Sequence, residues 1–174
     1  MAFIVEDGTG VPNANAYIDV PFFTEYFETR GVVFTEDEET IKTWIVQGTD
    51  YIEQVFGWRL IGTKMTTEQG LHFPAKFAYT RSGVLLDDNI VPALLMRACA
   101  EYARRARTGP LIPDPLTDAT GYIVVTTRKK IGPIEKEFQV MGSSGPMLIR
   151  SYPQADSLMT DLLNYAGGGT RVIR

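Results

Sequence analysis

The chain has 174 residues, of which 44% are hydrophobic and 22% are charged, with a net charge of −4; this suits one globular domain with a sizeable core. His72 is its only histidine and Cys99 its only cysteine, which excludes an internal disulfide and leaves few residues for metal or triad chemistry. No run approaches the roughly 18 apolar residues of a membrane span, and the N-terminal MAFIVEDGTG lacks the charge and apolar run of a signal peptide. We therefore expect a cytosolic chain with no membrane partner.

The charge is distributed unevenly along the chain. Residues 1–40 carry nine acids against Arg30, a net charge of −8, which leaves +4 for the rest. Unlike patches of this kind suit subunits that meet head to tail, although solvated helix faces would give the same pattern. An acidic total is a poor footprint for free nucleic-acid binding.

Two helices are predicted in the first third of the chain. The first runs from Val20 to Arg30, with Asp19 as N-cap and an aromatic face formed by Phe22, Phe23, Tyr26 and Phe27. The second follows a capping box of Thr35 and Glu38 and ends at Gly57. Its apolar residues keep helical spacing over four turns, which places it at the centre of a bundle: Ile41, Trp44, Ile45, Gly48, Tyr51, Ile52, Val55 and Phe56.

Residues 58–89 read as a long connection that is apolar enough to be packed, and connections of this length are usually functional or interaction segments. A third helix is predicted from Ile90 to Arg107, with one face buried. Its opposite, solvent-facing side is expected to carry Arg97, Glu101, Arg104 and Arg105.

The pattern then changes to that of strands. β-branched and alternating residues predict a hairpin at about 121–141, and a short helix is expected from Pro153 to Tyr165. The fold class is therefore mainly α: a small bundle of three to four helices with a long loop, a β-hairpin-like insertion and an extended C-terminal tail. We expect one domain over residues 1–166 and a flexible tail at 167–174, which begins with the Gly-rich run.

No residue set predicts catalysis, a metal site or a cofactor. His72 lies between apolar neighbours and is expected to pack or hydrogen-bond, and Cys99 is expected to act as a small buried hydrophobe. Gly8-Thr9-Gly10 lacks the strand and helix that flank a phosphate-binding loop. Asp87-Asp88-Asn89 lacks the glycine and glutamate of a calcium loop, and capping of the third helix explains it better.

The hairpin carries a basic run that we predict to contact DNA or another subunit. Its members are Arg128, Lys129, Lys130 and Lys136. Cations near aromatic residues can follow a phosphate backbone, whereas a charged strand edge that discourages aggregation explains the same run.

The C-terminal region is the second predicted contact. Residues 170–174 alternate like a strand that could add to the sheet edge of another chain, although a frayed terminus is the alternative. The residues expected to contact a portal protein or a neighbouring subunit are Leu158, Leu162, Leu163, Arg171, Val172 and Ile173.

Several segments in one order resemble a known group. They are FIVEDGTGVPNANAYIDV, YFETRG, GTDYIEQVFGWR, LHFPA, IVPALLMRACAEYARRA, GPLIPD, KKIGPIEKEF and YPQADSLMTDLL. Together they resemble small phage proteins labelled DnaT-like single-stranded-DNA-binding proteins, a group similar in layout to the head-to-tail connector adaptors of phages. The resemblance extends from about Phe3 to Leu163.

This resemblance implies a structural virion protein without catalytic residues or cofactors. Its subunits would form a homo-oligomeric ring, usually of twelve, in the virion neck between the portal protein and the tail or stopper protein. Double-stranded DNA would pass through its channel with transient contact, and the chain would stay in the host cytoplasm before assembly. The alternative is a single-stranded-DNA-binding replication accessory protein, for which salt-sensitive oligonucleotide binding is expected.

Overall fold

The structure is a computed structural model that describes residues 2–114, 123–130, 135–141 and 150–164, with the backbone alone in the two strands after residue 122. The described part is mainly helical, as predicted. Its helices are α1 (Val20–Glu28), α2 (Glu38–Phe56), α3 (Ala93–Ala106) and α4 (Pro153–Met159), with the 3-10 turns η1 (Gly57–Arg59) and η2 (Thr160–Leu162). Its strands are β1 (Thr63–Lys64), β2 (Ala75–Lys76), β3 (Ile123–Lys130) and β4 (Glu135–Met141).

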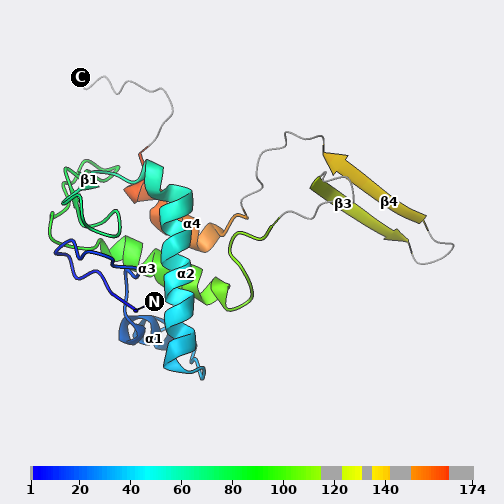
Figure 1. Cartoon of the computed structure of the whole chain (residues 1–174), viewed down its shortest axis with the longest axis horizontal. Coiled ribbons are helices and arrows are strands. Elements are labelled where there is room, and N and C mark those ends of the chain that lie inside the picture. The colour runs from blue at the N-terminus through cyan, green and yellow to red at the C-terminus, as the bar shows by residue number, and fades with distance from the viewer. Residues whose placement is uncertain (1, 115–122, 131–134, 142–149, 165–174) are drawn as a thin grey trace, which may run out of the picture. The chain divides into compact units, whose positions relative to one another are not determined.

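The chain divides into two units. The first comprises residues up to Leu111 together with those from Ser151 onward, and the second comprises Ile112–Arg150. The first unit, which we call the helical body, contains all four helices (Figure 1). The predicted single domain over 1–166 stays a prediction, and the predicted tail at 167–174 lies outside the described residues.

The start of α1 matches its prediction. The Asp19 carboxylate accepts a hydrogen bond of 2.8 Å from the backbone N–H of Phe22, which satisfies one of the free donors of the first turn. The helix buries Phe23 and Phe27 and leaves the other two predicted aromatic residues half-buried. It ends at Glu28, two residues before the predicted end.

The start of α2 differs from its prediction. Asp37 is the N-cap, and its carboxylate accepts from the N–H of Thr40 at 3.0 Å. The predicted capping box of Thr35 and Glu38 is wrong, because the helix begins only at Glu38 and Asp37 immediately before it supplies the acceptor. A carboxylate at this position also interacts favourably with the helix dipole.

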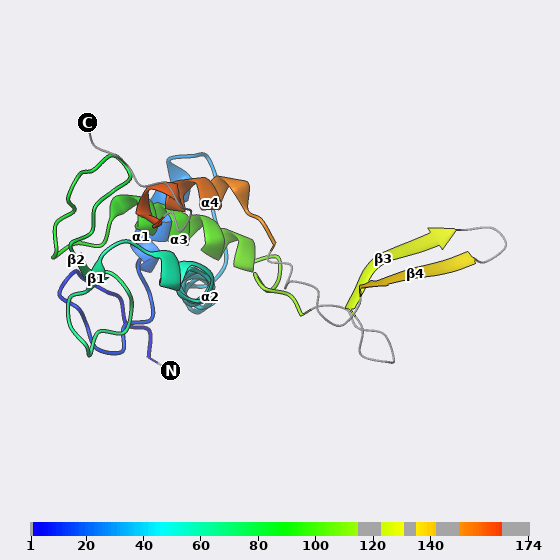
Figure 2. The ribbon, with the colours of Figure 1, turned by 90° about the horizontal axis from the view of Figure 1, so that it is seen from above.

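The crossing of α2 and α3 forms the centre of the helical body, as Figures 1 and 2 show. Gly48 lies at the crossing, where a Cβ atom would approach the backbone N of Ala103 to 2.9 Å and the carbonyl O of Cys99 to 3.0 Å. The two backbones are thus close enough to exclude any side chain at position 48. On either side of this point the buried residues of both helices form the core.

An aromatic cluster extends this core to α4. The rings of Tyr51 and Tyr102 have centroids 4.7 Å apart, and Tyr152 meets both at 5.6 and 6.0 Å. The Tyr102 hydroxyl donates to Asp156 at 2.6 Å, while the Tyr152 hydroxyl donates to the carbonyl of Leu111 at 2.9 Å. The polar end of each of these two rings therefore has a partner, as buried tyrosines require.

The connection between α2 and α3 is packed, as predicted, and it contains two short paired strands that the sequence did not indicate. β1 and β2 are antiparallel, with Thr63 opposite Lys76. The buried amide of Gln69 donates to three carbonyls, those of Leu71, His72 and Pro74, at 2.8 to 3.0 Å. Apolar side chains anchor the segment to the body: Leu60, Ile61, Leu71, Phe73, Ala75 and Ala78 are buried.

The last helix is shorter than predicted. α4 ends at Met159 and continues as η2, instead of running to Tyr165. The N–H of Ile61 donates to the carbonyl of Leu162 at 3.0 Å, so η2 is tied to the segment that follows η1. None of the helices in the described part of the chain combines the length and apolar character of a membrane span.

The second unit contains the predicted hairpin. β3 and β4 pair antiparallel from Ile123 opposite Met141 to Lys130 opposite Glu135, with a register irregularity between Val124 and Thr126. They form a sheet of two strands.

Replacing Gly48 by alanine should destabilise the helical body by roughly 1–3 kcal/mol, because the added methyl group forces two backbones apart. The matched control is Gly57→Ala: its φ of −49° is helical, and the nearest atom to an added Cβ is 3.9 Å away. This control should be neutral or stabilise by up to about 1 kcal/mol. Urea unfolding followed by circular dichroism measures both, and equal effects would contradict the close approach.

Candidate interaction surfaces

His72 has a structural role. Its Nε2 lies 3.0 Å from the carbonyl O of Ile61, and its backbone N–H lies 3.2 Å from both the Tyr17 hydroxyl and the Glu53 carboxylate. The ring also meets Phe73 edge to face. These contacts hold the α2–α3 connection on the body and confirm the expectation that His72 packs and hydrogen-bonds.

Cys99 is fully buried in α3, as predicted. Its Sγ lies 3.4 Å from the Thr49 hydroxyl. Burial raises the pKa of this thiol to about 12, with the Thr49 contact acting in the opposite direction. A thiol held neutral in this way does not act as a nucleophile at physiological pH.

The glycine-rich N-terminal segment surrounds a protein carboxylate. Glu6 is buried, and its carboxylate accepts from the backbone N–H groups of Gly8, Gly10 and Val11 at 2.9 to 3.0 Å. Three N–H groups that converge on an anion are the arrangement of a phosphate cradle. Here the anion is the Glu6 side chain of the same chain, so the role of Gly8-Thr9-Gly10 is to form a loop that these hydrogen bonds hold closed.

Glu101 is the second buried carboxylate, and its place corrects the predicted solvent-facing side of α3. It accepts from Arg105 at 2.6 Å, from Gln154 at 3.0 Å and from the Tyr26 hydroxyl at 3.3 Å. One carboxylate thus joins α1, α3 and α4. Burial is tolerated because a cation and two further donors face it.

The acidic residues before α3 do not cap that helix. α3 begins at Ala93 after Pro92, with no side-chain cap, and the Asp87 carboxylate accepts instead from the N–H of Asn89 at 3.0 Å. The predicted capping role is therefore wrong, because three residues separate this turn from the helix. Within the described ranges no group of three or more His, Cys, Asp or Glu side chains could hold a metal ion.

The predicted basic contact lies on the two strands of the hairpin. In the backbone register Arg128 is opposite Glu137, Lys130 is opposite Glu135, and Lys129 is opposite Lys136. Residues 112–150 contain five cations and four acids in sequence, so the hairpin unit is close to neutral. The predicted DNA or subunit contact of these residues stays a prediction.

The leucines predicted to contact a portal or another subunit have unequal exposure. Leu162 is 1% exposed and belongs to the core of the helical body, because η2 folds back on the segment after η1. Leu158 and Leu163 are half-buried and retain some accessible surface. Arg171, Val172 and Ile173 lie outside the described residues, so their predicted contact stays a prediction.

Two further surfaces lie on the helical body; the first belongs to the connection that the sequence indicates as an interaction segment, and the second was not predicted. The α2–α3 connection, with its flanks, exposes large apolar side chains: Trp58, Phe77, Tyr79, Val84, Leu85 and Ile90. The outer side of α1 and α3 has a pocket of about 240 Å³ lined by Phe22, Glu25, Tyr26, Thr29, Arg30 and Arg97. Exposed apolar side chains, such as those of the α2–α3 connection, mark contact surfaces when they form a contiguous patch.

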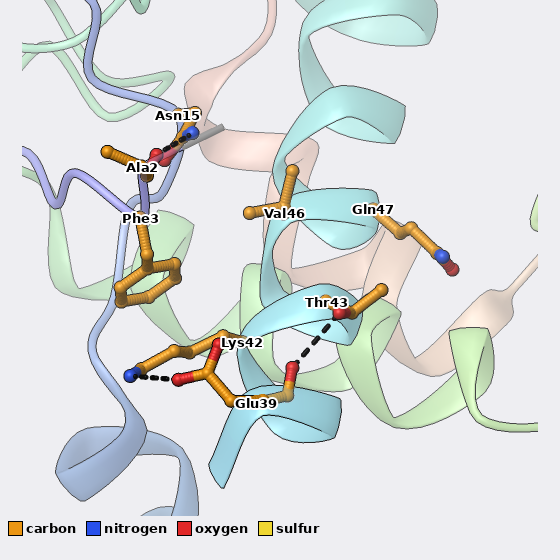
Figure 3. A pocket seen from close by; sticks show the side chains of 8 residues that line it. All are labelled: Ala2, Phe3, Asn15, Glu39, Lys42, Thr43, Val46 and Gln47. Atoms are coloured by element: carbon orange, nitrogen blue, oxygen red, sulfur yellow. Dashed lines mark hydrogen bonds and ion pairs between the residues drawn. The ribbon is translucent and has the colours of Figure 1, made fainter.

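A larger open groove of about 550 Å³ lies between the N-terminal segment and α2 (Figure 3). Its lining includes Phe3, Val46 and Lys42. The Lys42 ammonium already pairs with Glu38 at 2.9 Å and Glu39 at 2.8 Å, and these acids raise its pKa. The groove therefore offers no uncompensated cation to an anionic ligand.

The sequence of the whole chain matches one protein-family model. The family is described as "Putative DnaT-like ssDNA binding protein", and the match covers residues 1–174. No curated protein matches the chain. No solved structure matches it either.

Cys99 should resist thiol reagents in the folded protein. A pKa of about 12 instead of 9.0 lowers the thiolate population at pH 8 roughly 1,000-fold, and burial blocks access as well. Ellman's reagent should therefore modify Cys99 only after unfolding in denaturant. A Val33→Cys variant, which adds an exposed thiol, should react with one of its two thiols in the native state; rapid native reaction of Cys99 would contradict this placement.

Proposed function

The chain belongs to the family described as DnaT-like single-stranded-DNA-binding proteins, and from this premise we propose that it is a non-enzymatic binding protein whose main role is structural. As an adaptor it forms a ring in the neck of a phage particle. It contacts the portal protein on one side and the tail or stopper protein on the other, and DNA passes through its channel. The polar groups discussed above support this role, since Glu6, Glu101, His72 and Cys99 are engaged in holding the fold.

The observation that carries this proposal is the second unit. The hairpin of β3 and β4 interrupts the helical body in sequence, between α3 and α4. It is a sheet of two strands, and such a hairpin is marginally stable alone in water. Both of its strands are edge strands, which are templates for pairing with another chain. In a ring of subunits, the neighbouring subunit is the chain with which these edge strands can pair.

The exposed apolar side chains of the α2–α3 connection support assembly in a second way. Phe77 is 71% exposed, with Val84 and Leu85 at 58% and 54%. Phe77 also has a positive φ of 57°, a conformation that is uncommon outside glycine and asparagine. In the adaptor this segment contacts another protein chain, where the apolar area is removed from water.

Assembly should depend on Phe77 and not on exposed apolar area in general. Phe77→Asp removes the aromatic side chain and introduces a residue that tolerates the left-handed conformation. The helical body should therefore stay folded while assembly weakens about tenfold or more. The matched control is Val33→Asp, since Val33 is equally exposed at 71% but precedes α2. Native mass spectrometry, alone and with the portal protein, should give multiples of the 19.4 kDa subunit for the native chain and the control.

A chain that stays monomeric at every concentration, with and without the portal protein, would exclude the adaptor role. Equal loss of assembly in both variants would exclude the α2–α3 connection as the contact.

The family description favours a second candidate function, single-stranded-DNA binding in replication. It predicts that oligonucleotides bind at micromolar concentration or below, with an affinity that falls as salt rises by a slope of roughly 0.7 per phosphate contact. Replacing Arg128, Lys129 and Lys130 by alanine should weaken this binding. Fluorescence anisotropy of a labelled oligonucleotide over a salt series measures it, and an affinity insensitive to salt would contradict it.

A further inference from the structure

We propose that the pocket between α1 and α3 binds one nucleotide of a single-stranded nucleic acid, with Arg30 and Arg97 on the phosphate and the ring of Phe22 against the base. This inference rests on the second candidate function, single-stranded-DNA binding, and assigns it a site. We call the six lining residues the α1–α3 pocket: Phe22, Glu25, Tyr26, Thr29, Arg30 and Arg97.

The aromatic part of the pocket is a pair of rings one turn apart on α1. Phe22 and Tyr26 have ring centroids 6.3 Å apart and an angle of 14° between planes. Phe23 and Phe27 fill the core from the same helix, so the half-buried pair is an additional apolar surface on the outer side. Because the Arg30 guanidinium covers one face of the Tyr26 ring, we expect the base to stack on Phe22, and such stacking tolerates any base.

The first cation is held in place. The guanidinium carbon of Arg30 lies 3.6 Å from the centroid of the Tyr26 ring, and its Nη1 donates to the Tyr26 carbonyl and to the Thr29 hydroxyl. Stacking and these hydrogen bonds fix the plane of the group. Its Nε and Nη2 make no hydrogen bond to the described residues and are available to a phosphate oxygen.

The second cation, Arg97, is exposed and has no ion pair within the part of the chain that the structure describes. Two other arginines at the C-terminal end of α3 have acidic partners, Arg105 with Glu101 and Arg107 with Glu36. Arg97 has none among the described residues and lies on the pocket wall. Both pocket arginines act on Tyr26: burial and Glu101 raise the pKa of its hydroxyl, and Arg30 and Arg97 oppose that rise. Tyr26 thus stays neutral while two positive charges face the pocket.

Glu25 narrows the class of ligand. A carboxylate on the wall repels a bare phosphate or sulfate ion, whereas it accepts a hydrogen bond from the amino group of a cytosine. A ligand that combines a phosphate with a base satisfies the arginines, the Phe22 ring and the glutamate together. The volume of about 240 Å³ suits one nucleotide, so a longer strand would continue over the adjacent surface.

The test uses the full chain and a fluorescent oligonucleotide of about 12 cytidines. Arg97→Ala should weaken binding roughly tenfold and reduce the salt slope by about one contact. Phe22→Leu keeps an apolar side chain and should also weaken binding roughly tenfold through lost stacking. The control is Arg104→Ala, an exposed arginine of the same helix outside the pocket. It should change binding less than about threefold, because salt screens an exposed charge that does not touch the ligand.

Each outcome decides a separate claim. Equal losses for Arg97→Ala and Arg104→Ala, an unchanged Phe22→Leu, or competition by inorganic phosphate at matched ionic strength would overturn the pocket while leaving strand binding intact. An unchanged affinity of Arg97→Ala with altered oligomer mass would make the pocket a subunit contact and overturn the proposal. No oligonucleotide binding by the native chain would overturn the pocket together with the second candidate function. Circular dichroism confirms that each variant is folded.

Discussion

The contact of α2 with α3 at Gly48 is the constraint on which the rest of the helical body depends. Because the backbones approach to distances that exclude a Cβ atom, the side chains on both flanks are set at fixed separations. Thr49, the next residue, is fully buried; its hydroxyl lies 3.4 Å from Cys99 and accepts from the N–H of Tyr17 at 3.3 Å. The N-terminal segment is thereby joined to the crossing point. One turn further along α2, Tyr51 meets Tyr102 and extends the packing to α4.

Buried carboxylates connect the periphery to this centre. Glu6 closes the N-terminal loop with three backbone donors, and Glu101 joins three helices. A buried charge whose partners are removed costs several kcal/mol, about 3–5 for a broken pair, so each carboxylate specifies which segments must meet. The proposed functions therefore rely on groups that the described fold leaves exposed, namely the apolar side chains of the α2–α3 connection and the arginines Arg30 and Arg97.

Local patterns predicted the helices, because capping and spacing act within a few residues. Asp19 and the apolar spacing of α2 gave the correct elements, whereas Thr35 was displaced as a cap by the nearer Asp37. The spacing that Glu101 shares with the arginines of α3 predicts a solvent-facing side chain, whereas its burial depends on Gln154, which is 53 residues away. The hairpin was visible in its β-branched residues, and β1 and β2, two residues each, were too short to give a pattern.

The candidate sites were harder to predict than the fold, since each depends on segments distant in sequence. The α1–α3 pocket brings Arg30 and Arg97 together across 67 positions of the chain, whereas a count of charges along the sequence assigns them to regions of opposite net charge.

The net charge of the whole chain is also a poor guide to this site. The chain has a pI near 5.1, yet charges beyond a Debye length of about 8 Å at physiological salt are largely screened. A phosphate in the proposed pocket would therefore respond first to the two guanidinium groups and to Glu25 on its walls. The hairpin follows the same rule with the opposite result: its basic run is conspicuous in sequence, but in the strand register two of its cations are opposite acids. We therefore expect the hairpin to add less to the binding of an anionic strand than its basic run suggests, and the proposed pocket to add more than the net charge suggests.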